Sequence, residues 1–492
     1  MSHIYNEFKL EEATIASVHL AMEKDLINCR QLVEMYIKRI QDYDQKGPRL
    51  NSVIRINPRA LETADQLDKK FKESGFTGSL HGIPVLLKDN INTNDMPTTG
   101  GSLSLKDFLP EEEAFITRKL KEAGAIVLAK VNLHEFAIWG ETVSSILGQT
   151  LNPYDLTRTP GGSSGGTGAG IAANFAIIGI GTDTINSIRS PASACNLIGF
   201  RPTLGLVSRS GIIPYSLTQD TAGPIMRTVE DTAKVLDIIS GYDMEDPITA
   251  WSIGHIPKTY TDFLNKDGLQ GKTIGILKSF FGKEKIHEEV NTIIYSSLEE
   301  MKNNGAILID IEEEIDTDKL VNEVSVHLYE LKSHLNSYLE KAGAEVEVSS
   351  LTEIIESGKY HKGIEENIKL AETLNINSLE YNKRLVKREE LKNLIMEIMA
   401  KYNLDAIVYP HQKQPVVKIG KSQVDRNGVI GSVTGFPSCV VPAGFTKPRP
   451  TAPIGLPVGL EILARQWSEP ILFEIAYGFE YITNHRRLPL CK

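Results

Sequence analysis

The sequence predicts an α/β fold in which a mixed central sheet is covered by helices on both faces. Short apolar runs at 83–87 and 125–129 are typical of buried strands, and the segment between them, 114–123, has the apolar spacing of a helix. A second strand-like set follows at 406–408, 439–441 and 458–463. Strands that alternate with helices in this way indicate a sheet flanked by helices.

The remaining elements follow in chain order. Residues 13–22, 29–43 and 58–71 carry apolar side chains at three- and four-residue spacing, so the N-terminal part is predicted to be helical. Residues 159–224 are dense in glycine, serine, threonine and proline but include apolar runs, which favours tightly packed loops over a linker. Helices are expected at 327–341 and 380–399, and a last helix at 470–482.

Composition excludes several classes of protein. The 492 residues carry 53 Lys and Arg against 63 Asp and Glu, a net charge of −10, which is not the footprint of a nucleic-acid binder. The four cysteines (Cys29, Cys195, Cys439 and Cys491) show no CxxC spacing, so we expect neither a metal site nor a disulfide framework. Residues 1–12 do not have the pattern of a signal peptide, and the apolar run 171–180 is too short to span a bilayer. We therefore expect a cytoplasmic protein.

The glycine-rich segment 159–170 admits several interpretations by itself. Gly161 and Gly166 have the spacing of a phosphate-binding loop, but Thr167 stands where that loop requires lysine. No strand precedes the segment, which argues against a dinucleotide-binding fingerprint. Residues 161–165 match GxSxG, the hydrolase nucleophile elbow, by spacing alone. A glycine-rich turn without chemistry is an equally good interpretation of the segment taken alone.

Three separated motifs together carry more information than this loop. They are GIPVLLKDN at 82–90, GGSSGG at 161–166 and GTDTINSIRSPA at 181–192. In these motifs and their order the sequence resembles the amidase signature family, the Ser-Ser-Lys amide hydrolases. The resemblance covers most of the chain. It implies the α/β/α fold of that family and one domain over residues 1–492, with N-terminal helices at 1–70, the catalytic core at 71–225, a helix-rich variable region at 286–401 and C-terminal strands and a helix at 402–492.

The resemblance also implies roles for individual residues. Lys88 matches the catalytic lysine, Ser163 the bridging serine whose peptide bond to the preceding glycine is cis in the family, and Ser187 the nucleophile. Ser164 matches a supporting serine. The oxyanion hole corresponds to the backbone N–H groups of Thr184, Ile185, Asn186 and Ser187.

The chemistry of this set is coherent. A serine hydroxyl attacks an amide only if a base takes its proton, and a lysine with its ordinary pKa near 10.4 is charged at pH 7. Lowering that pKa to about 7.5 requires roughly 4 kcal/mol, which burial can supply. Ser163 would relay the proton between Ser187 and Lys88. Asp183 and Arg189 flank the nucleophile loop, and we expect them to support it through an ion pair or backbone hydrogen bonds.

One departure from the family concerns the nucleophile loop, where Ile185 and Asn186 replace the usual two glycines. A β-branched residue does not tolerate a positive φ, so we expect a negative φ at Ile185. The two side chains would then project near the substrate. Trp139 and neighbouring Ile138 are candidates for lining an acyl pocket.

The preferred interpretation is a free-standing amidase, a hydrolase acting on linear amides through an acyl-enzyme on Ser187. It needs no cofactor and no metal. Its partner would be a small-molecule amide, with no nucleic acid and no membrane, and a homodimer is compatible with the sequence. One alternative is the amidase-type component of a tRNA-dependent amidotransferase, which releases ammonia from glutamine and whose loop resembles GSDTGGSIRQPA. A non-catalytic nucleotide-binding module is a remote alternative, which the missing phosphate-loop lysine disfavours.

Overall fold

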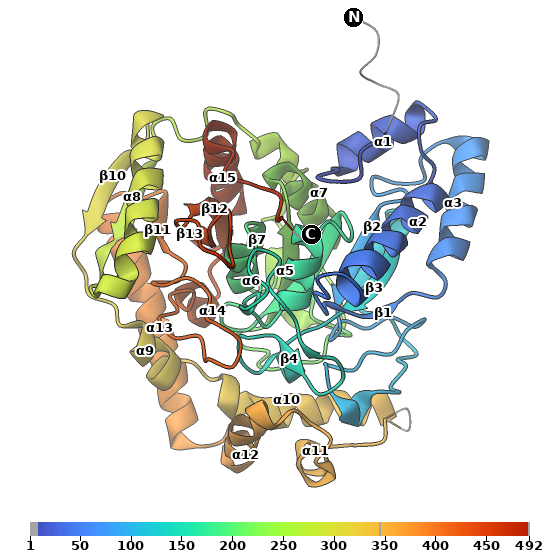
Figure 1. Ribbon diagram of the computed structural model, residues 1–492. Coiled ribbons are helices and arrows are strands. Elements are labelled where there is room, and N and C mark those ends of the chain that lie inside the picture. Colours follow the sequence, from blue (N-terminus) through green and yellow to red (C-terminus); the bar gives the residue numbers. More distant parts are fainter. Residues whose placement is uncertain (1–7, 344–345, 491–492) are drawn as a thin grey trace, which may run out of the picture.

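One mixed sheet of 11 strands runs through the molecule in the computed structural model, which describes residues 8–343 and 346–490 (Figure 1). The strand order is β1-β3-β2-β6-β8-β7-β12-β13-β11-β9-β10. Parallel pairs join β2 to β3 and β6, and join β9 to β10 and β11, whereas the strands between these two groups pair antiparallel. Helices flank the sheet, so the predicted fold class is confirmed.

The first half of the sheet positions the candidate site. Its strands are β1 (Val53–Ile56), β2 (Pro84–Lys88), β3 (Ile126–Val131), β6 (Ile178–Asp183), β7 (Ile198–Arg201) and β8 (Thr221–Met226). Strands β2, β3 and β6 are buried at every position, as expected of parallel strands that are covered on both faces. Their near-continuous apolar composition explains why β2 and β3 were predictable from the sequence.

The second half of the sheet comes from the later part of the chain. It contains β9 (Thr273–Leu277), β10 (Ile307–Ile311), β11 (Ala406–Pro410), β12 (Ser438–Phe445) and β13 (Pro457–Leu463), and a separate two-stranded ribbon pairs β4 (Val143–Ser144) with β5 (Gly148–Gln149). The predicted strands at 406–408, 439–441 and 458–463 are confirmed within β11, β12 and β13.

Helices pack along the sheet or cluster beside it. Those that contact its strands are α3 (Ala60–Ser74), α4 (Phe115–Glu122), α5 (Gly165–Ala172), α6 (Arg189–Ala194), α7 (Val229–Ile239), α8 (Glu288–Asn303) and α15 (Glu469–Thr483). Helices α1 (Ile15–Glu23) and α2 (Cys29–Ile40) lie beside α3 (Figure 1). Helices α10 (His327–Ala342), α11 (Leu351–Ser357) and α12 (Glu365–Thr373) pack on one another around a core of their own.

Three further helices lie between these groups. They are the short helix α9 (Thr317–Lys319), the long helix α13 (Leu379–Lys401) and α14 (Ile430–Thr434), and α13 contacts α14 directly. The predicted helices at 327–341, 380–399 and 470–482 are confirmed as α10, α13 and α15.

The glycine-rich segment folds more regularly than expected. Residues 159–224 contain α5, β6, α6 and β7 and the start of β8, rather than only packed loops. Helix α5 is rich in glycine because its backbone approaches its neighbours closely. A Cβ on Gly166 would lie 2.3 Å from the carbonyl oxygen of Asn132, and a Cβ on Gly168 would lie 2.8 Å from the Pro191 side chain. These glycines therefore serve close packing, which weak helix propensity would not reveal.

Two short edge strands were not predicted. Strand β1 interrupts the N-terminal helical region 1–70, and β10 lies in the helix-rich region 286–401. Each covers four or five residues at an edge of the sheet and is only partly buried, so neither has the apolar run of a central strand.

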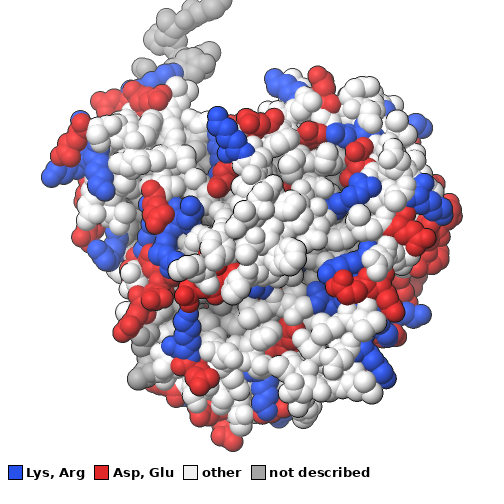
Figure 2. Space-filling view, turned by 180° about the vertical axis from the view of Figure 1, so that it is seen from behind, with Lys and Arg blue, Asp and Glu red and all other residues white. Residues whose placement is uncertain are grey.

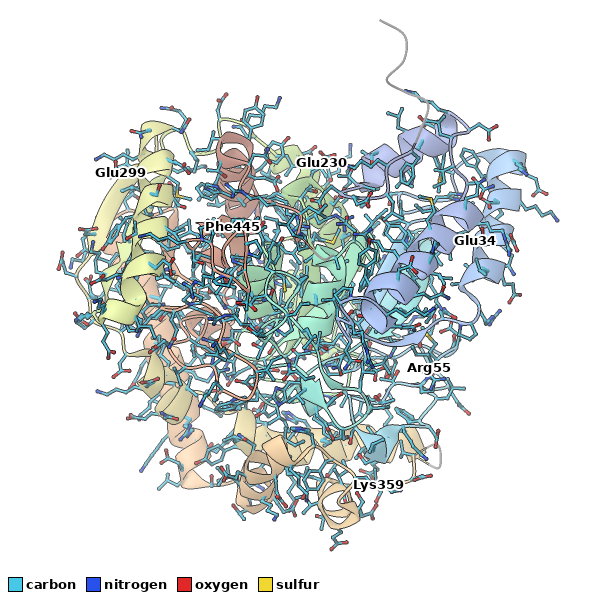
Figure 3. The ribbon with its side chains drawn as sticks, viewed as in Figure 1. Glu34, Arg55, Glu230, Glu299, Lys359 and Phe445 are labelled. Carbon is cyan, nitrogen blue, oxygen red and sulfur yellow. The ribbon has the colours of Figure 1, made fainter. Side chains whose placement is uncertain are left out.

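The surface carries charges of both signs. Exposed Glu34, Glu299 and Lys359 lie at the periphery of the molecule (Figure 3). On the face seen from behind, acidic and basic side chains are interspersed around a broad uncharged area (Figure 2). Among the described residues, every helix is too short or too polar to cross a lipid bilayer.

Candidate active site

The sheet brings the ends of two parallel strands together. Lys88 ends β2 and Asp183 ends β6, and the two strands are paired with Leu87 opposite Ile180. Because parallel strands end at the same edge, the loop 184–188 that follows β6 begins beside Lys88. The segment Gly161–Ser164 immediately precedes helix α5, which packs on both strands. Three motifs that are far apart in the sequence thus meet at one edge of the sheet.

Lys88 is fully buried and is surrounded by uncharged hydrogen-bond acceptors. Its Nζ donates to Ser163 Oγ at 2.7 Å, to Thr182 Oγ1 at 2.7 Å and to the Thr182 carbonyl oxygen at 3.3 Å. Among the described residues it forms no ion pair. Burial lowers the pKa of Lys88 to about 7, although the charges of Asp183 and Asp220 oppose that shift. The amine is therefore close to half neutral near neutral pH.

Ser163 lies between Lys88 and the nucleophile loop. The peptide bond between Gly162 and Ser163 is cis. The carbonyl oxygen of Ser163 accepts from the backbone N–H of His134 at 3.0 Å, and that of Gly161 accepts from Thr142 Oγ1 at 2.7 Å. These contacts hold the segment on both sides, so the position of the Ser163 hydroxyl is set by backbone hydrogen bonds.

Ser164 joins the segment to the other two motifs. Its Oγ donates to the carbonyl oxygen of Thr182 at 3.1 Å, and its backbone N–H donates to the carbonyl oxygen of Ser187 at 3.2 Å. It is fully buried. Through these two bonds Ser164 connects the end of β6 to the residue that the sequence suggests as nucleophile.

Ser187 lies in the loop between β6 and α6 and lines a cleft. No hydrogen bond between its hydroxyl and that of Ser163 is found in the described part of the chain. The backbone N–H groups of Ile185, Asn186 and Ser187 likewise have no acceptor among the described residues. Three free donors beside one hydroxyl form an arrangement that can bind an oxyanion.

The backbone at Ile185 and Asn186 does not have a positive φ. The expectation of an ordinary backbone conformation at Ile185 therefore agrees with the structure. The Ile185 side chain packs against a hydrophobic cluster, and both side chains line the cleft.

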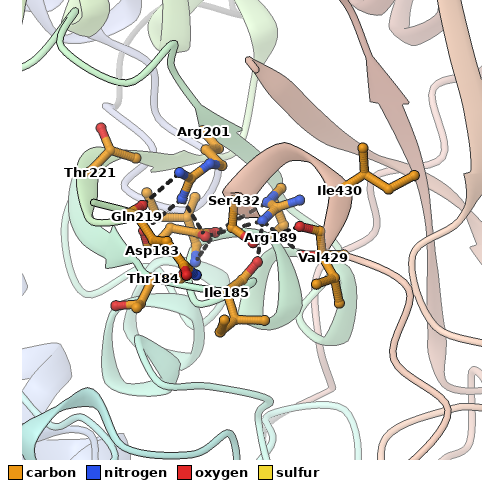
Figure 4. A network of polar contacts seen from close by, with 12 residues as sticks. Asp183, Thr184, Ile185, Arg189, Arg201, Gln219, Thr221, Val429, Ile430 and Ser432 are labelled. Carbon is orange, nitrogen blue, oxygen red and sulfur yellow. Dashed lines mark hydrogen bonds and ion pairs between the residues drawn. The ribbon is translucent and has the colours of Figure 1, made fainter. Parts of the chain in front are cut away.

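A chain of buried charges supports this loop from behind (Figure 4). Asp183 accepts from Arg189 Nη2 at 3.1 Å and from Arg201 Nη1 at 2.8 Å, and it also accepts from the backbone N–H of Ile188 at 3.0 Å. Burial by itself would raise the pKa of the Asp183 carboxyl, but the charges of Arg189 and Arg201 hold it well below its ordinary range. Arg189 also donates to the carbonyl oxygen of Ile185 at 2.6 Å, so it ties both ends of the loop together.

The same chain of charges extends to the C-terminal half of the sheet. Arg189 forms an ion pair with Glu461 on β13, and Glu461 accepts from His411 Nδ1 at 2.7 Å and from the Tyr409 hydroxyl at 3.1 Å. Sequence inspection missed Glu461 and His411, because the ion pair joins residues 272 positions apart. It also missed Thr182, although the identity of that residue next to Asp183 was a local signal.

The cleft has a volume of about 320 Å³ and opens beside Ser187. Trp139 lines it, as suggested from the sequence, whereas Ile138 is fully buried outside it. Its walls are formed by Ala137, Trp139, Thr184, Ile185, Asn186, Ser187, Tyr215, Asp318, Val321, Asn322, His327, Gln423, Val424, Asp425, Arg426 and Val429. Within the described residues no group of three metal-ligating side chains is found.

Comparison with known proteins places this geometry. The profile of the Amidase family matches residues 31–473. Over 94% of its length, the chain is 34% identical to 96% of the amidase-type component of the glutamyl-tRNA(Gln) amidotransferase of Gloeothece citriformis.

Solved structures give a second comparison. The native peptide amidase of Stenotrophomonas maltophilia superposes with a TM-score of 0.88 at 36% identity, covering 98% of this chain and 99% of that enzyme. The corresponding component of the glutamyl-tRNA(Gln) amidotransferase of Thermotoga maritima gives a TM-score of 0.75 at 26% identity, with 99% of each chain covered.

Proposed function

Since the chain belongs to the Amidase family, whose members act on C–N amide bonds, we propose that it is a free-standing amidase with Ser187 as nucleophile, Lys88 as base and Ser163 as proton relay. The observation that carries the proposal is the 2.7 Å hydrogen bond between Lys88 Nζ and Ser163 Oγ, inside a pocket where burial brings the pKa of the lysine to about 7. A base with a pKa near the working pH is the most effective kind.

The reaction begins with attack of Ser187 Oγ on the amide carbon. The hydroxyl proton passes to Ser163 Oγ, whose own proton passes to neutral Lys88. The bond from Ser163 to Ser187 must form for this step, and catalytic hydrogen bonds commonly tighten only when substrate binds. The oxyanion that develops is stabilised by the free N–H groups of Ile185, Asn186 and Ser187.

The second half of the reaction returns the proton. Protonated Lys88, through Ser163, donates to the leaving nitrogen as the C–N bond breaks, so ammonia or an amine departs and the acyl group stays on Ser187. Water, deprotonated by the same relay, then attacks the acyl-enzyme. The products are a carboxylate and free Ser187.

The alternative function is that of the amidase-type component of an amidotransferase, which is favoured by the 34% identity to such a protein. The structural comparison supports the free-standing interpretation instead, because the peptide amidase superposes more closely than the amidotransferase component does. Both functions use the same site and differ in whether a partner protein is required.

The test is hydrolysis by the purified chain alone. A panel of primary amides, aryl amides and glutamine is assayed for release of ammonia or amine. We expect turnover of at least one amide without a partner, and loss of several powers of ten in Ser187→Ala with an unchanged circular dichroism spectrum. Ser193→Ala, a change of the same size in neighbouring helix α6, is the matched control. Turnover that is confined to glutamine and appears only with an added amidotransferase partner would support the alternative.

A further inference from the structure

Arg426 is a half-buried arginine of the cleft wall that has no polar partner. Among the described residues its guanidinium donates no hydrogen bond and forms no ion pair. Burial lowers its pKa, against the charge of Glu141. The Glu141 carboxylate accepts from the backbone N–H of Gln423 at 2.8 Å rather than pairing with Arg426. A guanidinium with five unused donors in a partly dry site is costly unless a ligand or water binds it.

The buried arginines behind the nucleophile loop show the contrast. Arg189 contacts two carboxylates and two carbonyl oxygens, and Arg201 contacts Asp183 and the carbonyl oxygen of Gln219. Those side chains are saturated by the protein and serve structure. Arg426 lies in a cavity rather than in a packed network, so its donors are available to a ligand.

The guanidinium is held in place by its apolar surroundings. It lies over the ring of Trp139, 4.8 Å from the centroid, and the Trp139 indole N–H donates to Ser422 Oγ at 3.0 Å. Trp139 has a φ of 101°, a conformation that L-residues rarely adopt and that is retained where the surroundings enforce it. The indole and the guanidinium thus form one fixed wall of the cleft.

Gly140 places this wall next to the candidate catalytic segment. A Cβ on Gly140 would lie 3.0 Å from Arg426 Nη1 and 3.9 Å from the carbonyl oxygen of Gly162. The guanidinium therefore lies a short distance from the residue before Ser163. A substrate whose scissile carbonyl is at Ser187 can reach Arg426 with the far end of its acyl group.

The other groups of the cleft leave Arg426 as its available cation. Burial lowers the pKa of His327 to about 4, so this imidazole is neutral at pH 7. The carboxylate of Asp425 is engaged by His287 at 3.1 Å and by Gln414 at 2.7 Å, and Asp318 lies exposed on α9. Ile185, Val321 and Val429 provide apolar walls between Ser187 and the guanidinium.

We propose that the cleft selects amides whose acyl group ends in a carboxylate, which Arg426 binds through its guanidinium while the apolar walls hold the connecting chain. A planar guanidinium matches a carboxylate with two parallel hydrogen bonds, and such charge-assisted pairs are stronger than neutral ones. The inference rests on the proposed amidase function, because it places the scissile bond at Ser187.

The test compares monoamides of straight-chain dicarboxylic acids with the corresponding diamides. The two differ only in whether the far end is a carboxylate or a neutral amide. For the best chain length we expect kcat/KM per amide group to be about ten- to a hundredfold higher for the monoamide acid. In Arg426→Gln the ratio should fall to near one, and Arg426→Lys should retain part of it. Lys421→Gln removes the same charge from an exposed position of the same loop and should keep the full ratio.

A binding measurement makes the inference independent of turnover. By calorimetry, a free dicarboxylate of the preferred length should bind the wild-type chain and the Lys421→Gln variant, and its affinity should fall about tenfold or more in Arg426→Gln. Thermal melting checks that each variant is folded.

The outcomes separate this inference from the proposed function. Diamides hydrolysed as well as monoamide acids at every length, or a ratio that persists in Arg426→Gln, would overturn the carboxylate preference while leaving the amidase function intact. If no amide is hydrolysed, the proposed function fails, and the dicarboxylate affinities then decide the role of Arg426.

Discussion

Two buried lysines on neighbouring strands differ in what surrounds them. Lys88 on β2 and Lys130 on β3 lie almost side by side, because Leu87 is paired with Lys130 and Lys88 with Val131. Both side chains are fully inaccessible to solvent. Lys130 forms an ion pair with Asp89 at 3.4 Å and donates to the carbonyl oxygen of Ile91 at 2.6 Å. Lys88 donates to hydroxyl and carbonyl oxygens of Ser163 and Thr182 and has no acid beside it.

This difference shows that burial alone does not make a lysine a base. Burial lowers the pKa of both amines, and for Lys130 the neighbouring Asp89 charge opposes the shift. The Lys130–Asp89 pair ties β3 to the loop after β2, which is a structural task. Lys88, without a counter-charge, can lose its proton near pH 7 and faces the hydroxyl of Ser163. The two lysines should therefore respond differently to mutation and to pH.

The largest effect is expected for Lys88. Replacement by alanine should lower kcat/KM by several powers of ten, because the relay loses its proton acceptor. Arginine should not restore activity, since a guanidinium does not deprotonate. The thermal midpoint should not fall by more than a few degrees, because no charged partner is left unpaired. Amide hydrolysis and thermal melting measure the two quantities, and a folded Lys88→Ala enzyme with substantial activity would remove Lys88 from the mechanism.

The opposite pattern is expected for Lys130. Lys130→Met leaves Asp89 buried without its counter-charge, so the free energy of unfolding should fall by about 3–5 kcal/mol. Adding Asp89→Asn removes the stranded charge and should recover part of that loss. Denaturant unfolding measures both variants. A loss of less than about 1 kcal/mol would mean that the pair is not structural, since a broken buried ion pair should cost more.

The pH dependence should report Lys88 and not Lys130. The neutral amine is the active form, so kcat/KM should rise about tenfold per pH unit below the pKa of about 7 and level off above it. Lys130→Met, assayed where it is folded, should keep the same limb. A flat profile on both sides of pH 7 would contradict a titrating lysine base.

The smallest effect compares the two threonines that accept from these amines. Thr182 Oγ1 accepts from Lys88 at 2.7 Å, and Thr98 Oγ1 accepts from Lys130 at 2.9 Å. Because an acceptor favours the charged amine, Thr182→Val should move the acidic limb to lower pH by about one unit. Thr98→Val should leave the limb in place and lower stability by about 1 kcal/mol. An upward shift in Thr182→Val, or equal shifts in both variants, would show that the hydroxyl does not set the lysine pKa.

Much of the fold could be predicted from local patterns. The apolar runs of β2 and β3 and the spacing of α10 and α13 are properties of short segments, so they were visible without the structure. Strands β1 and β10 were missed because an edge strand is defined by its partner more than by its own composition. The glycines of α5 suggested loops, since the contacts that require them come from Asn132 and Pro191.

The candidate site divides in the same way. By itself the sequence determined the residue types and the motifs that contain Lys88, Ser163 and Ser187, because motifs are local. Only the tertiary structure decided which lysine lacks a counter-charge, that Arg189 reaches Glu461, and that Arg426 faces the cleft without a partner among the described residues. Charge compensation depends on groups brought together from distant positions: Lys88 contacts residues 75 and 94 positions away. A pKa near 7 is therefore a property of the folded chain, since it follows from burial and from the acids that the fold leaves out.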